Sequence, residues 1–148
     1  MKIVIINGPN LNMLGIREPG IYGTQNYKDL EAFCKQACKE AGADCEIIQS
    51  NHEGELVDAI QSAYGQADGI VINPAAYTHT SIAILDALKA VGIPAVEVHL
   101  SDIGAREEFR QISYAGMACE KTFKGMGFEG YRGAVRYLAD RCQSKPDR

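Results

Sequence analysis

Residues 69–92 read GIVINPAAYTHTSIAILDALKAVG. The run from Gly69 to Ile72 is apolar and rich in β-branched side chains, which is typical of a parallel strand covered on both faces. From Ser81 onward the apolar residues recur at the spacing of a helix, and Gly92 is expected to end that helix. A strand followed by a helix is the repeating unit of α/β proteins, so these residues predict that fold class.

The same alternation of strand and helix extends over nearly the whole chain. Further strands are expected at Ile3–Ile6, Cys45–Ile48, Ala95–Val98 and, as a short fifth strand, Lys121–Lys124. Apolar stripes at helical spacing predict three further helices, which carry residues Tyr27–Ala41, Leu56–Tyr64 and Tyr131–Cys142. Because parallel strands joined by helices use right-handed crossovers, we predict a flavodoxin-like three-layer α/β/α sandwich around a parallel five-stranded sheet.

Length and composition indicate one domain, residues 1–148. The chain has 148 residues, of which 46% are hydrophobic, and this is enough to fill a core without metals or disulfides. The five cysteines form no CxxC pair, and Cys34, Cys38 and Cys142 fall on apolar stripes, so we interpret these three as core residues. The absence of an apolar run of membrane length and of a signal peptide favours a cytoplasmic protein with no membrane partner.

The charge is unevenly distributed, although 15 basic and 19 acidic side chains give a net charge of only −4. The basic residues near the carboxyl end are interleaved with apolar residues at helical spacing and have no aromatic stacking platform, so we expect no nucleic-acid partner. Residues 1–120 contain only three arginines, Arg17, Arg106 and Arg110, each in an expected loop or at the end of an element. Arginines placed in this way suggest that the protein holds an anion.

Polar residues follow the first four strands, at the edge where open α/β sheets bind ligands. The connection after the first strand, from Asn7 to Asn26, is long and has no periodicity, so we expect a lid loop at about residues 13–25. It contains neither GxGxxG nor a P-loop sequence, which argues against a dinucleotide or a nucleoside triphosphate.

All three histidines, His52, His79 and His99, come directly after expected strands. Their separation lacks the close pairing of zinc ligands, so no metal site is expected. Amide and hydroxyl side chains surround them in the sequence, at Asn7, Asn10, Asn12, Asn73, Thr78, Thr80, Ser81 and Ser101. Some of these serve turns and helix caps, and the remainder would suit a polyhydroxylated small molecule that bears a carboxylate.

Five blocks of sequence closely resemble type II 3-dehydroquinate dehydratases, in order and over essentially the whole chain. The blocks are Asn7-Gly-Pro-Asn-Leu-Asn12, Arg17-Glu-Pro with Tyr22-Gly23, Asn73-Pro-Ala-Ala-Tyr-Thr-His-Thr-Ser81, Glu97-Val-His99 and Ala105-Arg-Glu-Glu-Phe-Arg110. Asp102 departs from the pattern, because asparagine is expected after the His-x-Ser block. This change could alter the local charge but replaces none of the residues needed for the chemistry.

The resemblance implies a hydro-lyase that converts 3-dehydroquinate reversibly to 3-dehydroshikimate through an enolate. This reaction belongs to the shikimate route, which leads to chorismate and aromatic amino acids, and also to quinate breakdown. The family uses no metal, nucleotide or other cofactor and no Schiff-base lysine. Members of the family assemble as dodecamers of four trimers, and the resemblance implies the same assembly for this chain.

The resemblance also implies roles for individual residues. Tyr22 would be the proton acceptor, His99 the proton donor and Arg17 the group that stabilises the transition state, while Asn10 positions a water at the enolate and Glu97 orients His99. Substrate would contact Asn73, His79, Leu100, Ser101, Arg110 and Asp86 of a neighbouring subunit. A free tyrosine, with a pKa near 10, is only about 0.1% ionised at pH 7, so Tyr22 would need the nearby charge of Arg17.

The local sequence also bears on the roles of Asp86 and Arg106. Helical geometry turns Asp86 away from the buried stripe, which fits a contact with another subunit. For Arg106 we favour a surface ion pair with Glu107 or Glu108 over a place in the site.

The alternative class of function is a non-catalytic flavodoxin-like module that binds flavin or another small molecule. A receiver domain is disfavoured, because Asn7 and Asn73 stand where acidic residues would be required. A flavin module stays open on the fold alone, and the absorption spectrum of the purified protein distinguishes it, since a flavoprotein is yellow.

Overall fold

The computed structural model describes residues 1–16 and 25–145. Within these residues, five parallel strands form one sheet in the order β2-β1-β3-β4-β5. The strands are β1 (Lys2–Asn7), β2 (Asp44–Gln49), β3 (Gly69–Asn73), β4 (Ala95–His99) and β5 (Lys121–Lys124). The predicted parallel five-stranded sheet is therefore confirmed, including its short last strand.

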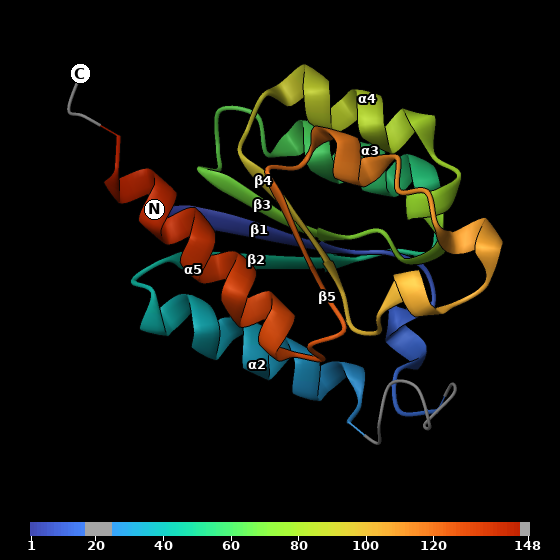
Figure 1. The fold of residues 1–148 in the computed structure, drawn as a ribbon. Helices are drawn as coiled ribbons and strands as arrows, with labels where there is room; N and C mark the ends of the chain where they lie inside the picture. Colours follow the sequence, from blue (N-terminus) through green and yellow to red (C-terminus); the bar gives the residue numbers. More distant parts are fainter. Residues whose placement is uncertain (17–24, 146–148) are drawn as a thin grey trace.

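Helices cover both faces of the sheet, as predicted. They are α2 (Tyr27–Glu40), α3 (Glu53–Ser62), α4 (Ile82–Val91) and α5 (Glu129–Gln143). Helices α2 and α5 lie against one face, and α3 and α4 lie against the other (Figure 1). In the described part of the chain, no helix combines the length and the apolar character needed to cross a bilayer.

The two faces of the sheet carry separate hydrophobic cores. Successive side chains of a strand point to opposite faces, so Ile3 and Ile5 pack under α2 and α5 while Val4 and Ile6 pack under α3 and α4. All four side chains are almost completely buried. This explains why the strand sequences are continuously apolar rather than alternating.

Helix ends follow local sequence signals. Asn26 caps α2 by accepting a hydrogen bond from the Asp29 amide, and the Asp29 carboxylate accepts one in return from the Asn26 amide. The Ser81 hydroxyl accepts a hydrogen bond from the Ile84 amide at the start of α4, and Gly92 ends that helix with a φ of 64°.

The sequence prediction was wrong at the end of the second predicted helix. We expected Tyr64 on its buried stripe, but α3 ends at Ser62 and Tyr64 is 70% exposed. The residues after Ser62 turn toward Gly65, whose φ is 72°, so helical spacing no longer determines which side chains face the core. Cys34 and Cys38 are buried as expected, whereas Cys142 is only partly buried.

Candidate active site

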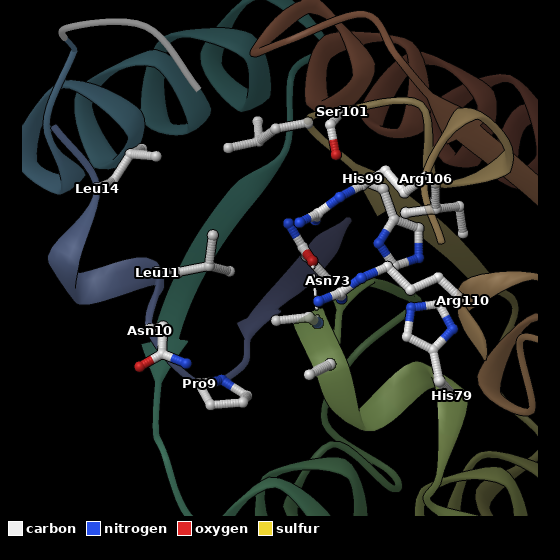
Figure 2. Close-up of a pocket in the computed structure, with 14 residues that line it drawn as sticks. Pro9, Asn10, Leu11, Leu14, Asn73, His79, His99, Ser101, Arg106 and Arg110 are labelled. Carbon is white, nitrogen blue, oxygen red and sulfur yellow. Dashed lines mark hydrogen bonds between the residues drawn. The ribbon is translucent and has the colours of Figure 1, made fainter. Parts of the chain in front are cut away.

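A cleft opens at the carboxyl ends of β1, β3 and β4, the edge where a ligand was expected. Its empty volume is about 640 Å³, including the solvent at its mouth. The lining residues come from the last positions of β3 and β4 and from the loops after these three strands, and they are Pro9, Asn10, Leu11, Leu14, Asn73, Ala75, Ala76, His79, His99, Leu100, Ser101, Ile103, Arg106 and Arg110. In Figure 2, Leu11 and Leu14 lie on one side of the cleft, and the two histidines and two arginines lie on the other.

The floor of the cleft depends on a close contact between two loops. In the sheet register Asn7 pairs with Asn73, and the Gly8 amide donates a hydrogen bond to the Asn73 carbonyl at 2.8 Å. Nearby, Asn10 and Ala75 have positive φ values of 69° and 53°. Such left-handed backbone is costly for residues other than glycine and is concentrated at functional sites, so it marks these two loops as tightly constrained.

His99 and Glu97 form a buried pair on one face of β4. The side chain of His99 is 5% exposed and that of Glu97 is 1% exposed. Nε2 of His99 lies 3.2 Å from Oε2 of Glu97, which is ion-pair distance, although the two groups are not aligned for a hydrogen bond. An imidazole that faces both a buried carboxylate and the cleft is suited to donating a proton to a bound molecule.

The Glu97 carboxylate is held in its ionised form. Burial opposes its ionisation, but the interaction with His99 and hydrogen bonds from the Ser113 and Thr78 hydroxyls outweigh burial and lower the pKa of Glu97 to about 2. A permanent negative charge therefore lies beside His99.

A buried hydrogen-bond network, which the sequence did not predict, fixes the side chain of Asn73. Its amide nitrogen donates to the Tyr131 hydroxyl at 2.9 Å, and Tyr131 donates to Oδ1 of Asn7 at 2.7 Å. Burial holds the pKa of Tyr131 well above its usual value, so the phenol keeps its proton. The sequence did contain a signal, because a tyrosine on the buried stripe of a helix requires a partner for its hydroxyl.

Of the three histidines, the structure brings two into the cleft. Nδ1 of His79 lies 2.7 Å from the Ile112 carbonyl oxygen, which can only accept, so Nδ1 carries the proton in this contact. His52 is exposed at the start of α3 and does not line the cleft.

Both Arg106 and Arg110 line the cleft, with side chains 15% and 19% exposed. Arg106 forms the ion pair with Glu107 that its sequence favoured, and it also lines the cleft, the place in the site that the sequence left open. Nε of Arg110 donates to Glu107 at 2.7 Å, and Nε of Arg106 lies 3.9 Å from the same carboxylate oxygen. Glu107 thus lies between the two guanidinium groups, and the short helix η4 (Glu108–Arg110) carries Arg110 to the rim.

The segment after β4 supplies Leu100 and Ser101 to the cleft. Asp102 does not line it. Its carboxylate accepts a hydrogen bond from the Gly104 amide at 3.0 Å and caps the short helix η3 (Ile103–Ala105), with Nζ of Lys124 4.0 Å away. The unusual aspartate is therefore used at a turn on the surface rather than in the cleft.

The loop after β1 places Asn10 at the cleft, where the backbone amide of Asn10 donates a hydrogen bond to Oδ1 of Asn51 at 3.0 Å. Arg17 and Tyr22 lie outside the described residues, as does most of the predicted lid. Asp86 is exposed on α4 and does not line the cleft of its own chain, so its predicted outward direction is confirmed. Among residues 1–16 and 25–145, no group of three His, Cys, Asp or Glu side chains is arranged to hold a metal ion.

Comparison with known proteins agrees with this arrangement. The family model described as Dehydroquinase class II matches residues 1–139. A 3-dehydroquinate dehydratase of Clostridium acetobutylicum is 54% identical over 131 residues, which cover 88% of this chain and 91% of the relative. A catabolic 3-dehydroquinase 1 of Aspergillus terreus is 54% identical over 138 residues, which cover 93% of this chain and 91% of the relative.

Solved structures show the same likeness in three dimensions. The crystal structure of a type II dehydroquinase from Butyrivibrio crossotus superimposes with a TM-score of 0.91 at 51% identity, covering 93% of this chain and 97% of that one. Family match, sequence identity and fold agree over nearly the full length, and the chain belongs to the type II dehydroquinase family.

Proposed function

We propose that this chain catalyses the reversible elimination of water from 3-dehydroquinate, giving 3-dehydroshikimate through an enolate. The observation that carries the proposal is the buried His99–Glu97 pair at the wall of a cleft whose rim holds two arginines. Loss of water from a β-hydroxy ketone requires a base for the hydrogen beside the carbonyl and an acid for the departing hydroxyl.

His99 is the acid in this mechanism. It gives its proton to the hydroxyl of the substrate, which leaves as water when the carbon–oxygen bond breaks. The ionised carboxylate of Glu97, 3.2 Å from Nε2, orients the ring. The buried position of both groups strengthens their interaction, because little water screens it.

Tyr22 is the base, and Arg17 keeps it ionised. Both residues lie outside the described residues. The assignment is therefore supported by the family match and by the sequence, in which Arg17 and Tyr22 are five residues apart in one connection. Tyr22 takes the hydrogen next to the carbonyl, and a water positioned by Asn10 stabilises the negative charge that develops on the enolate oxygen.

The remaining polar side chains of the cleft bind the substrate. Arg110 and the Leu100–Ser101 segment contact its carboxylate and hydroxyl groups, together with Asn73 and His79. Arg106 adds a second guanidinium to the rim, which favours an anionic substrate.

The chain is further proposed to act in the cytoplasm as a dodecamer of four trimers, in which Asp86 reaches the site of a neighbouring subunit. Several large apolar side chains are exposed near the cleft, as expected for surface covered by another subunit. Phe109 is 71%, Ile112 53% and Met117 62% exposed. On α4 the exposed Ile82 lies one turn before Asp86, so an apolar and an acidic side chain share the outward face.

Adding 3-dehydroquinate to the purified protein should produce the ultraviolet absorbance of a conjugated enone. His99→Ala should lower kcat by about 10²- to 10⁴-fold with a smaller change in KM, because general acid catalysis is lost while the binding groups stay. His52→Ala is the matched control and should keep full activity, since His52 is exposed and outside the cleft. A wild-type protein that forms no enone would contradict the proposed function.

A further inference from the structure

Three hydroxyl groups from outside β4 surround the carboxylate of Glu97. The Thr78 hydroxyl, from the short helix η2 (Ala75–His79), donates to Oε2 at 2.5 Å. The Ser113 hydroxyl also donates to Oε2, and the Thr122 hydroxyl of β5 donates to Oε1 at 3.1 Å. The oxygen that Thr78 and Ser113 share, Oε2, is the one that lies 3.2 Å from His99.

The proton count allows both hydroxyls to donate to the carboxylate. Each hydroxyl has one proton to donate and can accept further bonds. The Ser113 oxygen accepts a hydrogen bond from the Gly116 amide at 3.0 Å, which leaves its own proton for Oε2. The hydroxyl oxygens of Thr78 and Ser113 also lie 2.8 Å from each other, so two protons serve three contacts, and the contact between the hydroxyls carries no proton when both donate to Oε2.

We propose that Thr78 and Ser113 are positioning residues for the acid of the reaction, because their hydroxyls hold Oε2 of Glu97 ionised and in place against His99. The inference rests on the proposed function, in which His99 donates the proton. Neither residue is placed in contact with substrate, since neither lines the cleft.

The surroundings of Glu97 explain why the hydroxyls matter. A carboxylate that is 1% exposed is stable as an anion only when partners replace the water it has lost. A second cleft on the Glu97 side is lined by Arg110 and Lys124, but neither makes a described ion pair with Glu97, whereas Nε2 of His99 lies at ion-pair distance from it. Burial, with the charge of Glu97 added, raises the pKa of Cys119 to about 12, so this neighbouring thiol stays neutral.

Two variants at position 78 separate the hydroxyl from the shape of the side chain. Thr78→Val removes the hydroxyl and keeps the volume, and it should lower kcat by roughly 10- to 100-fold with KM changed by less than about threefold, because one charge-assisted hydrogen bond is lost. Thr78→Ser keeps the hydroxyl and should keep kcat within about threefold of wild type. Ser113→Ala, at a less buried position, should repeat the effect of Thr78→Val and serves where that variant does not fold.

The titration of the Glu97 carboxylate, followed by carbon-13 NMR, provides a readout that a purely structural role would not change. The low pKa of Glu97 means that its charge is present above about pH 2 and is lost as the pH falls through that value. Loss of the Thr78 or Ser113 hydroxyl removes a hydrogen bond to the ionised carboxylate, so the pKa of Glu97 should rise in Thr78→Val and Ser113→Ala but not in Thr78→Ser.

The outcomes distinguish the two proposals. An active wild-type protein whose folded Thr78→Val and Ser113→Ala variants keep the wild-type kcat and the wild-type pKa of Glu97 would overturn this inference alone. An inactive wild-type protein would remove the proposed function and this inference with it.

Discussion

At Gly8 the loop after β1 passes directly against the loop after β3. A Cβ atom at this position would lie 2.4 Å from the Pro74 carbonyl oxygen and 2.6 Å from its carbon. Both atoms are backbone, so neither can move aside as the end of a flexible side chain could. The glycine therefore sets the distance between the loops that carry Asn10 and Asn73.

Gly8→Ala should destabilise the protein by about 1–3 kcal/mol, because the extra methyl group forces the two loops apart. Activity should fall as well, since residues on both sides of the cleft are displaced. Urea unfolding and steady-state kinetics measure the two effects. Gly54→Ala, on α3 with nothing within 4 Å of its Cβ position, is the control and should stabilise the helix by about 0.5–1 kcal/mol. Equal stability of the Gly8 and Gly54 variants would contradict the steric argument.

Helix α5 shapes the site although it lies outside the cleft. It packs on the sheet through buried side chains, and its Tyr131 hydroxyl bridges Asn7 at the end of β1 and Asn73 at the end of β3. These two asparagines are 0% and 3% exposed, so water does not readily replace the phenol. The helix thus links two strand ends by one polar group within an apolar core.

Tyr131→Phe should lower the free energy of unfolding by about 1–3 kcal/mol, since the Asn7 and Asn73 amides each lose a buried partner. Urea denaturation measures this loss, and Tyr137→Phe is the control variant measured in the same way. The Tyr137 hydroxyl, on the same helix, donates a hydrogen bond to Glu120 at an exposed site. Tyr137→Phe should therefore lower the free energy of unfolding by less than about 1 kcal/mol. If both variants lose the same stability, the buried bridge does not stabilise the fold.

At the level of the whole molecule, the outward face of α4 and the exposed apolar side chains near the cleft have no role within a single chain that we have described. They are the surfaces on which we propose that another subunit packs. Asp86→Ala should raise KM by about tenfold if its carboxylate contacts substrate in a neighbouring subunit, because one charge-assisted bond is lost. Light scattering reports in parallel whether the dodecamer forms. Asp58→Ala, an exposed carboxylate on the adjacent α3, should change neither property. A fully active and fully assembled Asp86 variant would refute the contact between subunits.

The fold was predictable from sequence because its information is local. Continuous β-branched runs, helical stripes and the Ser81 and Gly92 caps each act within a few residues, and the structure confirms the sheet and its covering helices. The prediction was wrong at Tyr64, where a turn ended the helical spacing. The strand order β2-β1-β3-β4-β5, which was not predicted, is the order of flavodoxin-like sheets.

The site was only partly predictable, for a physical reason. The sequence indicated that His79, His99, Asn73 and Arg110 lie beyond strand ends, and the structure places all four at one cleft. The sequence did not show that Arg106 faces this cleft. That Tyr131 joins two strands and that Thr78 and Ser113 converge on Glu97 depends on four hydrogen bonds between residues 16 to 124 positions apart. Sequence determines which groups are available and on which element they lie, whereas only tertiary packing determines which of them meet.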